Sequence, residues 1–457
     1  MPVKIVTWSA NRPCRIVEDF LRRPAFDPKA ETAAAAVLER IREKGEPALL
    51  EAIAAFDRAP LAAHELRVGE AEAASAASAV PASLRRAVRE AHRRIVRFAR
   101  AGLPRDWSIK TPCGGMLGEQ FSPLDRVGAY IPGGVTPLVS TALMTVTLAK
   151  VAGVREIVAC TPCAADKSVN PALLHALQVA GATEIYRVGG IQAIGMMAYG
   201  AGVIRPVRKI VGPGGAYVTA AKRQVYGSVA LDLVAGPSEI AVLADSSARP
   251  EWVAADLLSQ IEHGTGNEKA LLATDSAELA QAVSEQLDEQ SKTLSRASRV
   301  RQTMDEGGVL LVVVPDLVQA VDLVNAFAPE HLELSVARPK ALASQVTSAG
   351  AIFLGHWTPE SAGDFVAGPS HVLPTGGAAH MFSGLTVGDF MRRTSLIEFT
   401  RADLEETLPV IEAFGAVECL DGHARAATLR CPRPSKTGTR STRGARKPGG
   451  SPRKPAR

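Results

Sequence analysis

Short β-branched runs alternate with alanine-rich helical stretches from about residue 124 onward, and this alternation restricts the fold more than any other feature. The first set of runs comprises Arg126–Ile131, Glu156–Cys160, Glu184–Val188 and Lys209–Val211. The helical stretches that follow these runs are Ser140–Val151, Pro171–Ala180, Gln192–Ala198 and Ala216–Tyr226. The second set comprises Glu239–Ala244, Ala270–Thr274, Val309–Val314, Leu332–Val336 and Ala351–Leu354. Because strands that alternate with helices form mostly parallel sheets with right-handed crossovers, the sequence predicts an α/β protein with two sheet-centred units.

The region before these runs, residues 28 to 102, reads almost entirely as helix. Its alanine-rich segments carry Glu and Arg at helical spacing, and they are Glu31–Lys44, Pro47–Phe56 and Pro81–Ala101. The region after them, roughly residues 385 to 430, is too short to fold alone, and we expect it to pack against something larger.

The net charge of +5 hides an uneven distribution. Residues 432–457 carry nine Lys or Arg and no acidic residue, so the rest of the 457-residue chain has a net charge of −4. That segment also holds five Pro and four Gly. It cannot bury enough apolar surface to offset its ordering entropy, so we expect a disordered basic tail. A solvated appendage explains the tail, although such charge also suits nucleic acid or an anionic surface.

The six cysteines do not form the framework of a small disulfide-rich protein. They stand at positions 14, 113, 160, 163, 419 and 431, and Cys160-Thr161-Pro162-Cys163 has no second pair at zinc-binding spacing. We therefore expect free thiols, with the C-x-x-C as loop sequence at the end of a strand. No secretory signal and no apolar run of membrane-spanning length is present. The prediction is a cytoplasmic protein, with neither a membrane nor nucleic acid as an expected partner.

Four segments offer imidazole, carboxylate and carboxamide groups that suit a metal and acid–base chemistry. Gln260 and His263 close the helical stretch Asp256–Gly264 and point from one face of its last turn. Taken alone, such a pair is more often a solvated or hydrogen-bonded helix end. The other segments are Glu330-His331, the Gly- and Pro-rich loop Gly363–Gly377 with Asp364 and His371, and the pair Glu418 and His423. Gln, His and Asp without thiolate are typical of a zinc site that stays open to substrate.

Glycine-rich turns follow three strands of the first set. They are Ile131-Pro132-Gly133-Gly134, Val188-Gly189-Gly190-Ile191-Gln192 and Gly212-Pro213-Gly214-Gly215. Glycines at such turns let the backbone approach a ligand and leave helix N-terminal N–H groups free for phosphate. None matches the G-x-G-x-x-G fingerprint. A binding crevice at the sheet edge and plain tight turns both remain open.

Taken together, these segments resemble the histidinol dehydrogenase family over residues 30 to 430. The motifs that carry the resemblance stand in the family's order and spacing, and they are Gly236-Pro237-Ser238-Glu239, Asp256–Gly264, Ala328–Glu333, Ser370–Gly377 and Glu418–His423. The resemblance implies two incomplete Rossmann-like sheet domains, a helical N-terminal region and a small C-terminal dimerisation domain. The first implied α/β domain comprises residues 28–123 plus 238–382 and holds the metal ligands and the Glu-His pair. The second comprises residues 124–237 and lies on the NAD side. An N-terminal extension at 1–27, a C-terminal domain at 383–431 and the tail at 432–457 complete the chain.

The resemblance also assigns residues. One Zn²⁺ per subunit would be held by Gln260, His263, Asp364 and His423, the last from the partner in an intertwined homodimer. Glu330 and His331 would be catalytic. The substrate, L-histidinol, would be contacted by Ser238, Gln260, His263, His331, Asp364, His371, Glu418 and His423. NAD would be contacted by Tyr130, Gln192 and the residue at position 215, where the family usually has Asn and this chain has Gly215.

The implied reaction is a four-electron oxidation of L-histidinol to L-histidine through L-histidinal, with two NAD reduced. His331 would take the hydroxyl proton, and Glu330 would activate water. The alternative within the same chemistry is a related zinc- and NAD-dependent enzyme that oxidises another small amino alcohol or polyol. An inactive scaffold that binds nucleic acid through its basic tail is the alternative from a different class.

Overall fold

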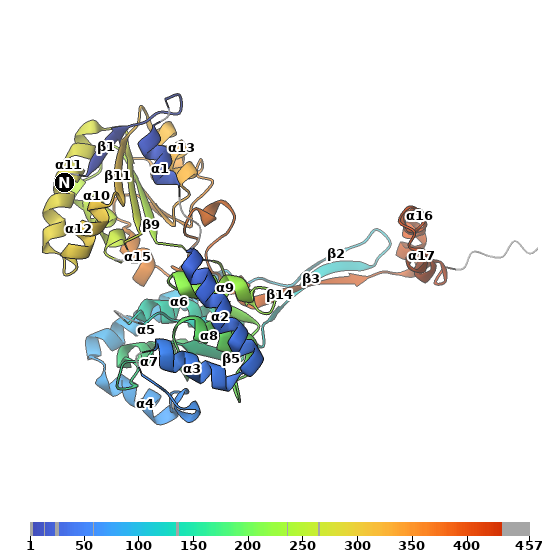
Figure 1. The fold of residues 1–457 in the computed structure, drawn as a ribbon. Coiled ribbons are helices and arrows are strands. Elements are labelled where there is room, and N and C mark those ends of the chain that lie inside the picture. Colours follow the sequence, from blue (N-terminus) through green and yellow to red (C-terminus); the bar gives the residue numbers. More distant parts are fainter. Residues whose placement is uncertain are drawn as a thin grey trace, which may run out of the picture. The chain divides into compact units, whose positions relative to one another are not determined.

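The structure, a computed structural model, describes residues 3–12, 14–22, 27–57, 59–133, 137–234, 236–263 and 266–431. Gly134, Gly264 and the predicted basic tail therefore lie outside the described residues. The chain forms two units, drawn in Figure 1. The first comprises residues 1–104 and 121–392, and the second comprises residues 105–120 and 393–457.

One half of the first unit is a parallel six-stranded sheet in the order β1-β11-β10-β9-β12-β13. Its strands are β1 (Lys4–Thr7), β9 (Glu239–Ala244), β10 (Lys269–Thr274), β11 (Val309–Val313), β12 (His331–Ser335) and β13 (Ala351–Leu354). Successive side chains of a strand point to opposite faces. Ile240 and Val242 accordingly enter one core, and Ala241 and Leu243 enter the core on the other face.

The helices of this half cover both faces of the sheet. They are α1 (Arg15–Leu21), α10 (Pro250–Ile261), α11 (Ala277–Gln290), α12 (Ala297–Asp305), α13 (Leu317–Phe327), α14 (Pro339–Ala343) and α15 (Glu360–Phe365). Helix α10 packs with α11 on one face, and α13 packs on the other. The chain as a whole also contains short 3₁₀ helices, which are η1 (Ala63–Glu65), η2 (Ser291–Thr293), η3 (Ala378–His380) and η4 (Val387–Phe390).

The other half of the first unit is a parallel five-stranded sheet in the order β6-β5-β4-β7-β8. Its strands are β4 (Arg126–Tyr130), β5 (Glu156–Cys160), β6 (Glu184–Tyr186), β7 (Lys209–Val211) and β8 (Ala230–Leu231). The connecting helices are α6 (Val139–Ala152), α7 (Pro171–Ala180), α8 (Gly190–Tyr199) and α9 (Ala216–Val225). The predicted α/β class with two parallel sheets is confirmed, and Cys160 and Cys163 are free thiols at and beyond the end of β5.

The N-terminal helices share the core of the five-stranded sheet. These helices are α2 (Pro28–Lys44), α3 (Glu46–Phe56), α4 (Glu70–Ala79) and α5 (Ala82–Ala101). Their apolar faces join Val127 and Ala129 of β4 in one hydrophobic cluster. This packing contradicts the predicted grouping of 28–123 with 238–382. It also leaves 1–27 as more than an extension, because β1 pairs with β11.

The second unit carries most of a three-stranded sheet and two helices. The strands β2 (Trp107–Lys110), β3 (Met116–Pro123) and β14 (Met391–Glu398) lie in the order β14-β3-β2. Helix α16 (Arg401–Val417) and helix α17 (Asp421–Thr428) follow. The carboxylate of Asp403 accepts from the backbone N–H of Gly115 at 3.1 Å, which ties the first turn of α16 to the β2–β3 hairpin. The core of this unit is small and rests on Leu408, Ala427 and Cys431.

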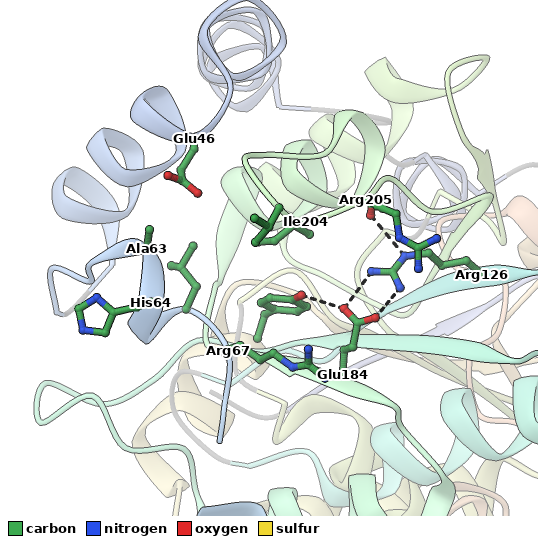
Figure 2. Close-up of a pocket in the computed structure, with 11 residues that line it drawn as sticks. Glu46, Ala63, His64, Arg67, Arg126, Glu184, Ile204 and Arg205 are labelled. Atoms are coloured by element: carbon green, nitrogen blue, oxygen red, sulfur yellow. Dashed lines mark hydrogen bonds and ion pairs between the residues drawn. The ribbon is translucent and has the colours of Figure 1, made fainter. Parts of the chain in front are cut away.

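The amino edge of the five-stranded sheet is held by a buried arginine, as Figure 2 shows. Arg126 at the start of β4 donates to Glu156 of β5 at 2.7 Å and to Glu184 of β6 at 2.5 Å. Its side chain is only 5% exposed. Arg205, which is 67% exposed, pairs with the same Glu156. One guanidinium thus joins the first residues of three neighbouring strands.

Replacing Arg126 with Met should destabilise the fold by about 3–5 kcal/mol, because it leaves Glu184 buried without its partner. The matched change Arg205→Met removes an exposed partner of Glu156 and should cost about 1 kcal/mol or less. Denaturant unfolding of both variants measures the difference. Equal losses in the two variants would show that burial of Arg126 has no special weight.

Candidate active site

Glu330 and His331 lie where helix α13 turns into strand β12, at the amino edge of the six-stranded sheet. His331 is the first residue of β12, and both side chains are buried. The turn passes through Ala328, which has a left-handed φ of +48°. A non-glycine residue rarely adopts that conformation, and such strain often accompanies functional sites. The carboxylate of Glu330 is fixed by the backbone N–H of Glu239, which donates to Oε2 at 3.1 Å.

The tautomer of neutral His331 follows from its neighbour Gln260. The Nδ1 atom lies 2.9 Å from the carboxamide oxygen of Gln260. Because that oxygen can only accept, Nδ1 carries the proton and Nε2 has the free lone pair. Nε2 is buried without a hydrogen-bond partner and lies 3.6 Å from Oδ1 of Asp364. The arrangement presents a proton acceptor next to a carboxylate.

Asp364 lies on the short helix α15 and brings further groups together. His371, in the following loop, donates from Nδ1 to the backbone oxygen of Asp364 at 3.0 Å, and Nδ1 is 3.8 Å from Oδ1. The other ring nitrogen of His371 lies 3.1 Å from the hydroxyl of Thr141, the third residue of α6. This contact joins the loop of the site to a helix of the five-stranded half.

His263 follows the end of α10 and is also oriented by a backbone group. Its Nδ1 donates to the backbone oxygen of Gln260 at 3.0 Å, which leaves Nε2 as the nitrogen with a lone pair. Metal-binding histidines are commonly held in this way by a carbonyl on the other nitrogen. The helix itself ends at Ile261, so Gln260 is helical as predicted, whereas His263 lies two residues beyond the end of the helix.

Burial and charge set the protonation states at the site. Burial raises the pKa of Glu330 to about 8. Burial alone would raise the pKa of Asp364, but the neighbouring imidazoles of His331 and His371 hold it at about 2. Burial alone would lower the pKa of His331, but the carboxylates of Glu330, Asp364 and Glu360 raise it to about 9. Glu330 and His331 therefore both hold a proton more tightly than their free side chains do.

The donor set fits a divalent cation. His331, Glu360 and Asp364 each offer one ligand atom, and these atoms lie within 4.8 Å of one another. Glu360 Oε1 and His331 Nε2, both able to offer a lone pair, are buried without hydrogen-bond partners. Buried polar groups are rarely left unpaired, and a cation beside the carboxylates would satisfy them. Oxygen and imidazole donors without thiolate are what zinc and neighbouring divalent ions accept.

The glycine-rich turns meet at the carboxyl edge of the five-stranded sheet. The strand order changes direction between β4 and β7, and ligands commonly bind at such a switch point. Tyr130 ends β4, and the turn after β7 approaches it so closely that a side chain at Gly212, whose φ is +110°, would collide with the Tyr130 carbonyl. The hydroxyl of Tyr130 accepts from the N–H of Gly190, and Gln192 donates to Asp57 at 2.9 Å.

The remaining predicted residues lie in two places. Ser238 stands directly before Glu239, the residue whose N–H holds Glu330. Glu418 and His423 belong to the second unit, where both are exposed. Within the first unit the structure brings Gln260, Asp364 and His371 together around His331. The exposed His263 contacts the Gln260 carbonyl and lies outside the group of ligand atoms that His331, Glu360 and Asp364 form.

Comparisons with known proteins show the family of this chain. The family model for histidinol dehydrogenase matches residues 21–431. The chain belongs to the histidinol dehydrogenase family. It is 47% identical to the histidinol dehydrogenase of Rhodopseudomonas palustris over 400 residues, which are 88% of this chain and 92% of that protein. It is 42% identical to that of Bradyrhizobium diazoefficiens over 430 residues, which are 94% of this chain and 99% of that protein.

A solved relative has the same fold. The crystal structure of histidinol dehydrogenase from Elizabethkingia anophelis superposes with a TM-score of 0.88 at 34% identity, covering 94% of this chain and 98% of that chain. The resemblance that the sequence motifs predicted is thus confirmed for the histidinol dehydrogenase family and for its fold.

Two groups near the site were not predicted. Glu360 precedes Asp364 by four residues, so both lie on one face of α15, and this spacing was the available signal. Thr141 carried no signal, because nothing in its helix indicates that His371 packs against it.

We expect Glu360→Gln to weaken the binding of a divalent cation by about 10- to 100-fold, because a carboxylate beside the ligands supports their charge and orientation. Titration of metal-free protein with zinc against a fluorescent chelator measures this affinity. The matched change Glu306→Gln, at an exposed helix end, should have no effect. An unchanged affinity in the Glu360 variant would remove that residue from the site.

Proposed function

We propose that this chain catalyses the oxidation of L-histidinol to L-histidine through L-histidinal, the last steps of histidine biosynthesis. Membership in the histidinol dehydrogenase family supports the reaction class. The observation that carries the proposal is the free Nε2 of His331, placed 3.6 Å from Asp364 and next to the buried Glu330. Two oxidations of one carbon need a base for the alcohol and a group that activates water for the aldehyde, and this pair offers both.

Gln260, His263 and Asp364 would hold a zinc ion, together with His423 from a second copy of the chain. When bound, zinc would orient the substrate through its imidazole and amine, and NAD would accept the hydrides. Orientation of the ligands is provided by the chain itself. His263 is turned by the Gln260 carbonyl, and Asp364 is held between His331 and His371.

The acid–base work falls to two neighbouring residues. His331 accepts the hydroxyl proton at Nε2 while its Nδ1–H stays bonded to Gln260. Glu330, whose pKa is raised to about 8 by burial, then takes a proton from the water that attacks the aldehyde. A carboxyl with a pKa near neutrality both accepts and releases protons readily at physiological pH. His371, Ser238 and Glu418 would complete the contacts to the substrate.

NAD would bind near the switch point between β4 and β7, with contacts from Tyr130 at the end of β4, Gln192 in the first turn of α8 and Gly215 at the start of α9. The free N–H groups at the start of α9, which Gly215 caps, suit a phosphate group. A side chain at position 215 would meet no atom within 4 Å. The family's usual Asn therefore has room in this chain.

A homodimer is proposed for two reasons. Glu418 and His423 are exposed on the second unit, so a site that includes them needs its other residues from outside that unit, which a second copy of the chain would supply. Helix α16 also exposes Val410 (54%), Phe414 (64%) and Val417 (84%) at helical spacing, an apolar face that suits a protein partner. Within the described ranges, none of the helices combines the length and apolar character needed to cross a membrane. The cytoplasmic location stays a prediction.

One experiment tests the reaction. Purified, zinc-loaded protein should form two NADH per histidinol consumed, because alcohol and aldehyde are both oxidised. A ratio of one would indicate a simple alcohol oxidation. Turnover of polyols or of other amino alcohols in preference to histidinol would favour the related enzyme instead.

His331→Asn should slow turnover by about 100-fold or more while zinc content stays near one per chain. Full activity in that variant would refute the role of His331.

We predict that Gly215→Asn tightens NAD binding by up to about tenfold, since one added hydrogen bond contributes about 0.5–1.5 kcal/mol. Gly69→Asn is the matched control, because Gly69 also precedes a helix in extended conformation with nothing within 4 Å. Calorimetric titration with NAD measures both. Weaker binding in the Gly215 variant, or equal gains in the two variants, would contradict the placement of NAD at this turn.

A further inference from the structure

The basic residues of this chain are concentrated in two segments. Helix α5 holds seven Arg, one Glu and no Lys, a net charge of +6. Residues 432–457 contribute +9, while the whole chain carries only +5, so the other 411 residues carry −10. An ordinary solvated surface mixes charges of both signs. A helix this basic within an acidic body points to an anionic partner.

Five of these arginines form one stripe along the exposed side of α5. The α5 arginine stripe consists of Arg86, Arg89, Arg93, Arg97 and Arg100, all exposed. At 100° per residue these positions fall within an arc of about 80°, and at 1.5 Å per residue they span about 21 Å. The opposite face of the helix is buried through Val88, Ala91, Ile95 and Ala99. The stripe therefore cannot be turned inward.

Most of the stripe is not neutralised by the protein. Glu90, the acidic residue of α5, pairs with Arg93 and Arg94. Arg86, Arg89, Arg97 and Arg100 form no ion pair and no hydrogen bond within the part of the chain that the structure describes. Across the helix interface lies His175 of α7, whose pKa is lowered by burial and by the charges of Arg85 and Arg89. The neighbouring helix thus offers an imidazole and no compensating carboxylate at this point.

The C-terminal half of the stripe borders a shallow groove of about 520 Å³. His92, Arg93, Val96, Arg97 and Arg100 line it. The groove lets an extended anionic chain lie between the guanidinium groups, rather than touch only their tips. Planar guanidinium groups match the geometry of phosphate with paired hydrogen bonds, and every cation of α5 is an arginine.

We propose that the α5 arginine stripe binds the phosphate backbone of duplex nucleic acid without reading its sequence. The stripe carries no aromatic side chain, and single strands need such groups for stacking. It also carries no large apolar residue that could enter a membrane. This differs from the expectation drawn from the sequence, which considered only the tail and expected no nucleic-acid partner. Four uncompensated charges correspond to a log–log salt slope of about −4 from the stripe alone.

The test uses the full chain, so that residues 432–457 contribute equally to every variant. Binding to a fluorescent 30-base-pair duplex is measured by anisotropy over a range of KCl concentrations. Arg89→Gln/Arg97→Gln should weaken binding and reduce the salt slope by about two, since each lost phosphate contact changes it by about 0.9. Histidinol turnover and the melting temperature should match those of the unmodified chain, because neither arginine touches the active site.

Arg338→Gln/Lys340→Gln is the matched control, since it removes the same charge from exposed positions elsewhere. It should leave the salt slope unchanged. Equal slopes in the two double variants would assign duplex binding to the tail or to overall charge and overturn the proposal. Absence of duplex binding at low salt would overturn it too. Binding to anionic phospholipid vesicles that depends on the stripe, without duplex binding, would show that the partner is a membrane.

Discussion

The acidic side chains of Glu330, Glu333 and Glu360 are buried. In the sequence, the first two lie next to or near His331, and Glu360 precedes Asp364 by four residues. Removing such groups from water is costly unless each is paired, protonated or bound to a cation. The protein pairs some of them, because backbone N–H groups hold Glu330 and Glu333 and the Ser259 hydroxyl holds Glu360. One oxygen of Glu360 and one nitrogen of His331 remain without hydrogen-bond partners. A stable fold around this cluster is easiest to understand if a positive charge completes it.

The two parallel sheets contribute opposite edges to the chemistry. The proposed catalytic pair, Glu330 and His331, lies at the amino edge of β12, whereas the glycine-rich turns lie at the carboxyl edge of β4, β6 and β7. The contact between Thr141 and His371 shows how these edges meet, since α6 leaves the carboxyl edge of β4 and reaches the loop that follows Asp364. A hydride acceptor at one edge and an alcohol at the other would then be neighbours. In parallel sheets this outcome requires two sheets, because the two edges of a single sheet are separated by the length of its strands.

The elements that were predicted well are those whose sequence pattern follows from the burial of their own faces. Strand β9 was placed at its observed bounds because both its faces are buried, and such strands read as unbroken apolar runs. Strand β1 was missed, since it is a mostly exposed edge strand of four residues. Helix α5 was found from its periodicity, but a buried face does not reveal what it is buried against. This is why residues 28–101 were assigned to the wrong sheet. The motifs pointed to Gln260, His331 and Asp364, which lie together in the structure, whereas the contact of Thr141 with His371 leaves no local trace in the sequence.

The metal ligands proposed for the first unit also bear on assembly. Zinc sites that work on substrates keep three protein ligands and a position for the substrate, and the proposed ligands Gln260, His263 and Asp364 would already reach that number. A fourth ligand from His423 would therefore close the shell unless the substrate expands it, as a molecule with its own imidazole and amine can. Such a shell would select among substrates, because it would require both a partner chain and a substrate with two ligand groups. The exposed apolar face of α16 would then serve catalysis indirectly, by holding His423 of one copy at the site of another. On this argument dimerisation and substrate selection are one requirement, since loss of the α16 contact would remove a zinc ligand without altering any residue of the first unit.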